Sequence, residues 1–219
     1  MESNKLENKE LCTKCGGFCC KKSGCDYSAN DFESLHIDDL ELKLKEGHIS
    51  IVSVLKFKQL KNFKISTQPF LYLRARNVDR PIVDLVSLKT PCSMLTENGC
   101  TYSLENRPSG GVNLIPAPEL QCYPLKDPEE IVNSWKSYQN VLMSLVKRFT
   151  GKNLNESLKK DIKLFFLSMI KKDFEHVSTV EQKQADEFMR ILKQAYPELW
   201  KEACKESKNQ YTLQKRMKK

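Results

Sequence analysis

Cysteine is concentrated at one end of this 219-residue chain far beyond what ordinary core packing requires. Eight of its nine cysteines lie within the first 122 residues, and five of those lie between Cys12 and Cys25. A core can use Ala or Val in place of a buried thiol, whereas crowded thiols are prone to oxidation and mispairing. The crowding therefore predicts a chemical use of the sulfur atoms, as disulfides or as metal ligands.

The choice between these two uses depends first on the compartment. Residues 1–8 lack the apolar segment of a secretory signal, and no uncharged run approaches the roughly 18 residues of a membrane span. We therefore expect a cytoplasmic protein without a membrane partner. Disulfides are rare in reducing cytosol, so zinc or an iron-sulfur cluster is the favoured cofactor. Redox-active thiols and purely structural cysteines remain alternatives.

The spacing of the first cysteine group suits thiolate coordination. Cys12 and Cys15 form a C-x2-C pair, in which a turn lets two sulfurs reach one ion, and Gly16 can supply the backbone angles of that turn. Cys19 and Cys20 are adjacent, and adjacent residues in an extended chain point to opposite sides. These two thiols therefore serve either two different sites or a polynuclear cluster.

A second cysteine group begins at Cys92, about 70 residues after Cys25. Asn98-Gly99 predicts a tight turn that directs Cys92 and Cys100 to one point. The complete set of predicted metal ligands is Cys12, Cys15, Cys19, Cys20, Cys25, Cys92, Cys100 and Cys122. Eight thiolates suffice for two four-coordinate centres, or for one cluster with thiols to spare.

The ninth cysteine and the three histidines are weaker candidates for metal ligands. Cys204 lies on the apolar side of the last predicted helix beside Trp200, which favours a small buried hydrophobic residue. The three histidines are separated from the cysteine groups, and only His36 is a candidate worth following.

The hydrophobic patterns predict an α+β fold with two regions. Residues 1–125 form the cysteine-rich metal-binding region with a small antiparallel sheet, and residues 126–219 form an all-α helical region packed on or beside it. The predicted strands are residues 49–57, 70–76 and 82–88. A helix over residues 37–46 should end at Gly47, and the proline-rich stretch 103–128 should be irregular.

The helical region should contain four helices. Apolar residues at three- and four-residue intervals predict one continuous helix over 131–149, ended by Gly151, and a second helix over about 158–170. Ser178-x-x-Glu181 is a capping box for a third helix. Pro197 should begin a short last helix, and the tail 215–219 should be frayed.

The net charge of +8 is uneven along the chain. Residues 1–125 have 16 basic and 15 acidic side chains, whereas residues 126–219 have 20 and 13. Most lysines alternate with glutamates in helical patterns, which is typical of solvated helix faces. Nucleic acid is therefore disfavoured as a partner, and a nucleic-acid-binding zinc module ranks last among the functions considered.

Three sequence blocks resemble one known family. The string CxxCGGFCC at residues 12–20, the string PC-x7-C at residues 91–100 and the pair Arg107-Pro108 resemble the YkgJ-like cysteine-cluster family, described as zinc- or iron-chelating domains. The resemblance covers about residues 10–125 and implies metal chelation. Family members usually have another cysteine soon after the Arg-Pro pair, where this chain has Ser-Gly-Gly-Val and, further on, Cys122.

The resemblance leaves the question of catalysis open. Domains of this kind also occur in flagellin lysine N-methylases, so a cluster-dependent enzyme acting on a protein substrate is an alternative to simple metal binding. No G-x-G-x-x-G loop follows a predicted strand, which disfavours the common nucleotide-binding pocket. The polar residues nearest in sequence to the cysteines are Asp26, Tyr27, Tyr102, Arg107, Asn113 and Tyr123. Each can equally be a turn residue or a support for the ligands.

Overall fold

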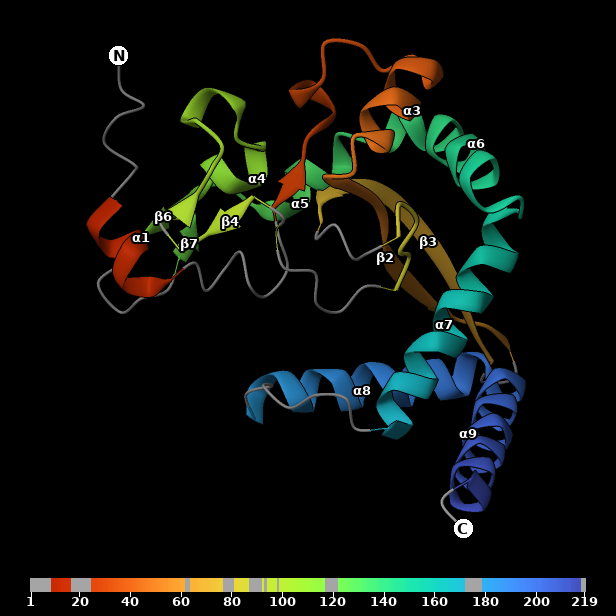
Figure 1. The fold of residues 1–219 in the computed structure, drawn as a ribbon. Coiled ribbons are helices and arrows are strands. Elements are labelled where there is room, and N and C mark those ends of the chain that lie inside the picture. Colours follow the sequence, from red (N-terminus) through yellow and green to blue (C-terminus); the bar gives the residue numbers. More distant parts are fainter. Residues whose placement is uncertain are drawn as a thin grey trace. The chain divides into compact units, whose positions relative to one another are not determined.

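The structure is a computed structural model that describes residues 9–16, 25–61, 64–76, 81–86, 92, 94–97, 99–116, 122–171 and 179–217. It is a mixed α/β fold with a small antiparallel sheet in the N-terminal half and helices in the C-terminal half (Figure 1). Residues 1–53 and 71–153 form one compact unit, and residues 54–70 and 154–219 form a second.

The elements of the N-terminal half are mostly short. They are α1 (Lys9–Cys15), β1 (Asp26–Tyr27), η2 (Ala29–Asp31), α3 (Ile37–Lys45), β2 (Ile49–Gln59), β3 (Ile65–Ala75), β4 (Leu95–Thr96), β5 (Gly99–Cys100), η4 (Leu104–Asn106), α4 (Ser109–Val112), β6 (Leu114–Pro116) and β7 (Cys122–Pro124). The C-terminal half consists of α5 (Pro128–Asn133), η5 (Lys136–Tyr138), α6 (Gln139–Thr150), α7 (Leu154–Lys171), α8 (Thr179–Ala195) and α9 (Pro197–Met217).

The main sheet has the strand order β1-β3-β2. β1 runs antiparallel to β3, with Asp26 opposite Arg74 and Tyr27 opposite Leu73. In the first unit, apolar side chains of β2 and β3 form the core of the sheet and are buried: Ile49, Ile51, Val52, Leu71 and Leu73. The predicted strands at 49–57 and 70–76 are confirmed, although β2 and β3 are both longer than predicted.

The third predicted strand, residues 82–88, is wrong for its described residues 82–86. Ile51 and Val83 form only an isolated parallel bridge, with hydrogen bonds from Ile51 N to Ile82 O and from Asp84 N to Ile51 O. Side-chain hydroxyls supply the neighbouring contacts, because Ser50 Oγ donates to Pro81 O and Ser53 Oγ donates to Leu85 O. The sheet takes β1 as its third strand instead.

The predicted continuous helix over 131–149 is also wrong, because it is interrupted at Trp135. α5 ends before this residue, which has φ −82° and ψ 1° outside the helical region, and η5 and α6 follow. The break lets the fully buried indole donate from Nε1 to Tyr27 O over 2.7 Å. The buried hydrogen bond and the burial of the ring offset the loss of helical continuity.

Two predicted helix ends are confirmed at glycines. Gly47 has φ +92° just after α3, and Gly151 has φ +67° at the end of α6.

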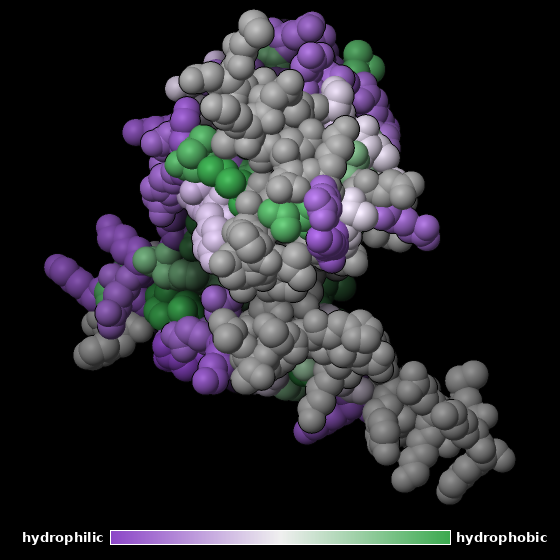
Figure 2. All heavy atoms as spheres, turned by 90° about the vertical axis from the view of Figure 1, so that its left-hand side faces the viewer, coloured by the Kyte–Doolittle hydropathy of each residue, from purple (hydrophilic) through white to green (hydrophobic). Residues whose placement is uncertain are grey.

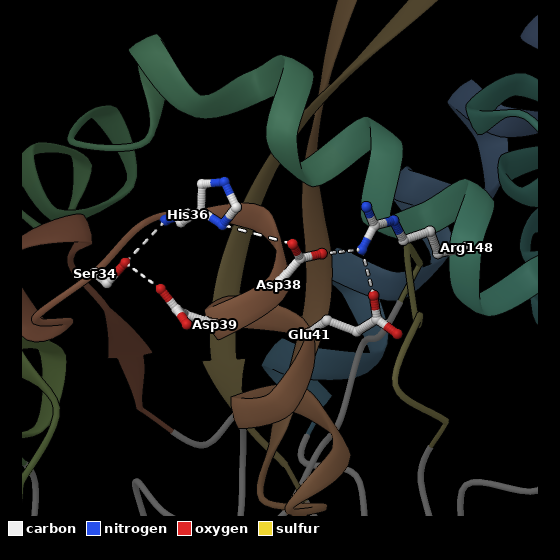
Figure 3. A network of polar contacts seen from close by, with 6 residues as sticks. All are labelled: Ser34, His36, Asp38, Asp39, Glu41 and Arg148. Atoms are coloured by element: carbon white, nitrogen blue, oxygen red, sulfur yellow. Dashed lines mark hydrogen bonds and ion pairs between the residues drawn. The ribbon is translucent and has the colours of Figure 1, made fainter.

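α3 packs against α6, and Arg148 Nη1 lies 2.7 Å from Asp38 Oδ1 and 2.6 Å from Glu41 Oε2 (Figure 3). His36 Nδ1 lies 3.8 Å from the other oxygen of Asp38, at the exposed edge of this network.

The second unit has an aromatic core. α7 and α8 both pack against α9. Phe188 of α8 contacts Phe165 of α7 and Phe57 of β2, with ring centroids 5.5 and 6.1 Å apart. Phe166 contacts Trp200 of α9 edge to face. The predicted helix start at Pro197 is confirmed, whereas α9 continues to Met217 and is neither short nor frayed at residues 215–217.

Ser178, the first residue of the predicted capping box, lies outside the described residues. Within the described helices, none is both long enough and apolar enough to cross a membrane.

Replacing Trp135 with Phe should lower the free energy of unfolding by about 2 kcal/mol, because the variant loses a buried hydrogen bond and leaves unfilled volume. Urea unfolding measures this change. Leu125→Ala is the control, since Leu125 is 54% exposed and its truncation should change stability by less than about 0.5 kcal/mol. Equal stability of the Trp135 variant and the wild type would contradict the role assigned to the indole.

Candidate metal centre

Four of the eight predicted ligands have side chains that the structure describes. Cys25 and Cys92 are buried, whereas Cys100 and Cys122 are half-buried. All four belong to the first compact unit. None of these four forms a disulfide. Reduced thiols with partial or full burial are the state from which thiolate ligands form.

The first cysteine group is described only in part. Cys12 and Cys15 lie on α1, but their side chains fall outside the described part of the chain, as do Cys19 and Cys20 altogether. Two backbone features of this group are defined. Gly16 has φ +61°, a left-handed angle available to glycine, as the predicted turn requires. α1 also packs against β5, the strand that ends at Cys100.

Cys92 and Cys100 flank one small hairpin. β4 pairs antiparallel with β5, so that Leu95 lies opposite Cys100 and Thr96 lies opposite Gly99. Leu95 N donates to Cys92 O, which turns the chain directly after that cysteine. The predicted reversal of the chain between Cys92 and Cys100 is therefore confirmed, and its backbone leads into the α1 contact.

A pair of tyrosine hydroxyls lies among three of these thiols. Tyr27 Oη and Tyr102 Oη are 3.0 Å apart. Burial, the hydrogen bond with Tyr102, and the nearby Cys92 and Cys25 raise the pKa of Tyr27 far above its ordinary value of 10.0. Burial also raises the pKa of Tyr102, the bond with Tyr27 lowers it in part, and Cys92 and Cys100 raise it. Both phenols therefore stay neutral at neutral pH, and Cys25, Cys92 and Cys100 lie near enough to influence one or both of their pKa values.

Cys25 packs against a glycine pair. A Cβ added to Gly111 would lie 3.0 Å from Cys25 Sγ, and one added to Gly110 would lie 2.6 Å from Asp26 O. Any larger residue at these positions would displace the thiol or the strand that carries Asp26. The glycines belong to the short helix α4, so the predicted irregular structure over 103–128 is wrong at this point.

Cys122 lies on a second hairpin. β6 pairs antiparallel with β7, and Pro116 lies opposite Cys122. The amide of Asn113 closes the base of this hairpin, because Nδ2 donates to Lys126 O and Oδ1 accepts from Lys126 N. α4 packs against β6. The predicted irregular stretch is thus ordered into a helix and a hairpin on both sides of Asn113.

The polar candidates near the cysteines mostly hold the backbone in place. Asp26 forms an ion pair with Arg74, with Oδ1 and Nε 2.5 Å apart and both side chains largely buried. Arg107 Nη2 donates to Tyr102 O over 3.4 Å. Tyr123 is 53% exposed. The roles of Arg74 and of the glycine pair carry no signal in the sequence, since neither belongs to a spaced motif.

Two weaker candidates lie away from the thiols described above. His36 is exposed at the start of α3, where its imidazole faces Asp38 (Figure 3). Cys204, predicted to be a small buried hydrophobic residue, is half-buried on α9 in the second unit.

A complete metal site is not found within the described part. Among the side chains that the structure describes, no three His, Cys, Asp or Glu residues are grouped so that they could hold a metal ion. That search does not include the side chains of Cys12, Cys15, Cys19 and Cys20. The described thiols fit a thiolate site by their chemistry, and the remaining ligands would have to come from the first cysteine group.

Comparison with known proteins gives no relative. No protein-family model, no curated protein and no solved structure matches this chain. The resemblance to the YkgJ-like family therefore stays a prediction based on the cysteine and Arg-Pro motifs.

Replacing Tyr72 with Phe should reduce the loss of stability at alkaline pH. Burial raises the pKa of Tyr72 above its ordinary value of 10.0, Arg74 lowers it in part, and Asp26 raises it. Above about pH 10 the unfolded chain loses a proton that folded Tyr72 keeps, so this residue lowers the free energy of unfolding by up to about 1.4 kcal/mol per pH unit. Below that pH its contribution is fully present.

Urea unfolding of both proteins at several values from about pH 9 to about pH 11 measures the two slopes. The variant should show the shallower decline. Identical declines would contradict the raised pKa of Tyr72.

Proposed function

We propose that this protein binds zinc or an iron-sulfur cluster through cysteine thiolates drawn from both cysteine groups. The ligands would come from Cys12, Cys15, Cys19, Cys20 and Cys25 on one side and from Cys92, Cys100 and Cys122 on the other. The bound metal would supply a cross-link between remote segments of the chain, which adds its binding free energy to the stability of the fold.

The packing of α1 against β5 is the observation that carries this proposal. α1 contains Cys12 and Cys15, and β5 ends at Cys100, so two groups about 85 residues apart along the chain meet through their backbones. A metal held by only one group would not require this meeting. A metal held by both would convert the contact into a covalently fixed junction.

The Tyr27–Tyr102 pair supports the same location. Cys25, Cys92 and Cys100 lie near enough to raise the pKa of one or both phenols, and a Cβ added to Gly111 would lie 3.0 Å from the Sγ atom of the buried Cys25. Phenol hydroxyls beside metal-bound sulfur can donate hydrogen bonds that orient the ligands and stabilise their charge. The elements around the thiols are short, which suits a region that a metal ion helps to hold.

The test is the metal content of protein purified without oxygen. We expect bound zinc, or iron together with acid-labile sulfide, and an absorption band near 400 nm would identify the cluster form. The double variant Cys92→Ser, Cys100→Ser should lower bound metal on the order of tenfold. Cys204→Ser is the matched control and should keep the wild-type content.

Wild-type protein that contains no metal after reconstitution, while all nine thiols react with a thiol reagent, would overturn the proposal. A double variant with the same metal content as the Cys204 control would overturn the assignment of Cys92 and Cys100.

A further inference from the structure

The net charge differs more between the two compact units than between the two halves of the sequence. Residues 54–70 and 154–219 contain 19 Lys and Arg and 10 Asp and Glu, a net charge of +9. The remaining residues contain 17 basic and 18 acidic side chains, a net charge of −1. The whole positive excess of the protein therefore belongs to the second unit.

Within that unit, the outer part of the β2–β3 hairpin is a segment of unbalanced positive charge. Residues 54–70 include Lys56, Lys58, Lys61 and Lys64 and contain no Asp or Glu. All four lysines are exposed. Among the described side chains, none of the four forms an ion pair, whereas the exposed Lys43, Lys45 and Lys201 each lie within 3.0 Å of a carboxylate. These three helical lysines are neutralised locally, and the hairpin lysines are not.

The two faces of this hairpin differ. Phe57 points to Phe188 of α8, and Thr67 shares a hydrogen bond with Tyr196, so one face packs on the helices of the same unit. Val54, Lys56 and Lys58 alternate with these residues and are exposed on the other face. Lys56 Nζ lies 5.0 Å from the centroid of the Phe70 ring, which places Phe70 on the exposed face as well.

Lys64, next to the turn of the hairpin, lies on the same exposed face as Lys56 and Lys58. Leu60 N donates to Lys64 O over 2.7 Å, so Leu60 and Lys64 lie opposite each other. Opposite residues in an antiparallel pair share a face, and so do residues two apart along a strand, spaced by about 6.6 Å. Lys56, Lys58 and Lys64 therefore form one row of positive charges along the ribbon, which we call the basic ribbon face.

We propose that the basic ribbon face binds the phosphate backbone of nucleic acid. A row of unneutralised lysines matches a row of phosphates, and a two-stranded ribbon has the dimensions of a major groove. Lys56 and Lys58 are spaced along β2, as contact with a linear row of phosphates requires, and Lys56 Nζ lies over the ring of Phe70.

The composition of the exposed residues supports a charged partner. On the face drawn in Figure 2, the coloured hydrophobic residues form small separate patches among hydrophilic ones. Among the described residues of the ribbon, the large exposed hydrophobic ones are Val54 and Leu60, at 40% and 44%. The sequence disfavours nucleic acid because most lysines alternate with glutamates, and residues 54–70 are a segment where that alternation is absent.

The test measures binding of full-length protein to a labelled duplex DNA and to a single-stranded RNA of equal length at several salt concentrations. The triple variant Lys56→Gln, Lys58→Gln, Lys64→Gln removes the basic ribbon face. The matched control Lys43→Gln, Lys45→Gln, Lys201→Gln removes the same charge from exposed lysines that already have carboxylate partners. Circular dichroism and metal content confirm that the variants are folded and that the cysteine region is unchanged.

We expect the wild type to bind at least one of the two probes, with affinity that falls as salt rises. The ribbon variant should lose about tenfold or more in affinity at low salt, and its logarithmic salt slope should decrease by about 2 to 3, since each phosphate contact contributes about 0.7 to 0.9. The control should stay within about twofold of the wild type.

Three outcomes would overturn the inference. They are equal losses in the ribbon variant and the control, no binding of either probe at low salt, and binding to phosphatidylserine vesicles without binding to nucleic acid. None of these outcomes bears on metal binding, because no variant in this test alters a cysteine.

Discussion

Residues 25–29 are held by hydrogen bonds from three remote segments, and the arrangement of the first unit depends on this stretch. Ala75 N of β3 donates to Cys25 O, Trp135 Nε1 donates to Tyr27 O, and Ser134 Oγ accepts from Ala29 N. The two-residue strand β1 could not persist without such partners, since isolated short strands are unstable in water. Its position places Cys25 against Gly111 and Tyr27 against Tyr102.

The features that the sequence predicted correctly are those with a local cause. Gly47, Gly151 and Pro197 mark helix boundaries because their backbone preferences act at the residue itself. The β-branched run of β2 and the reversal between Cys92 and Cys100 are local for the same reason. The broken helix at Trp135 was missed because its cause, the carbonyl of Tyr27, lies more than a hundred residues away along the chain.

The features of the candidate site likewise separate into those that the sequence indicates and those that only tertiary packing produces. Cysteine spacing predicts the ligands, and the hairpin and the α1 contact bring segments of both cysteine groups together. The tyrosine pair, the Asp26–Arg74 ion pair and the fit of Gly111 around Cys25 come from tertiary packing and leave no periodic trace in the sequence. The lysines of the hairpin can be read from the sequence. Only the structure shows that they are exposed and form no ion pair among the described side chains.

The second unit combines two segments that are far apart in the sequence, residues 54–70 and residues 154–219, and this separation matters while the chain is being synthesised. Phe57 leaves the ribosome long before Phe188, its ring partner, has been translated. At typical elongation rates the interval is on the order of ten seconds, far longer than a hairpin needs to form. During that interval the apolar side of the nascent hairpin has no helices to cover it, so these side chains stay exposed to solvent until α8 and α9 have been synthesised.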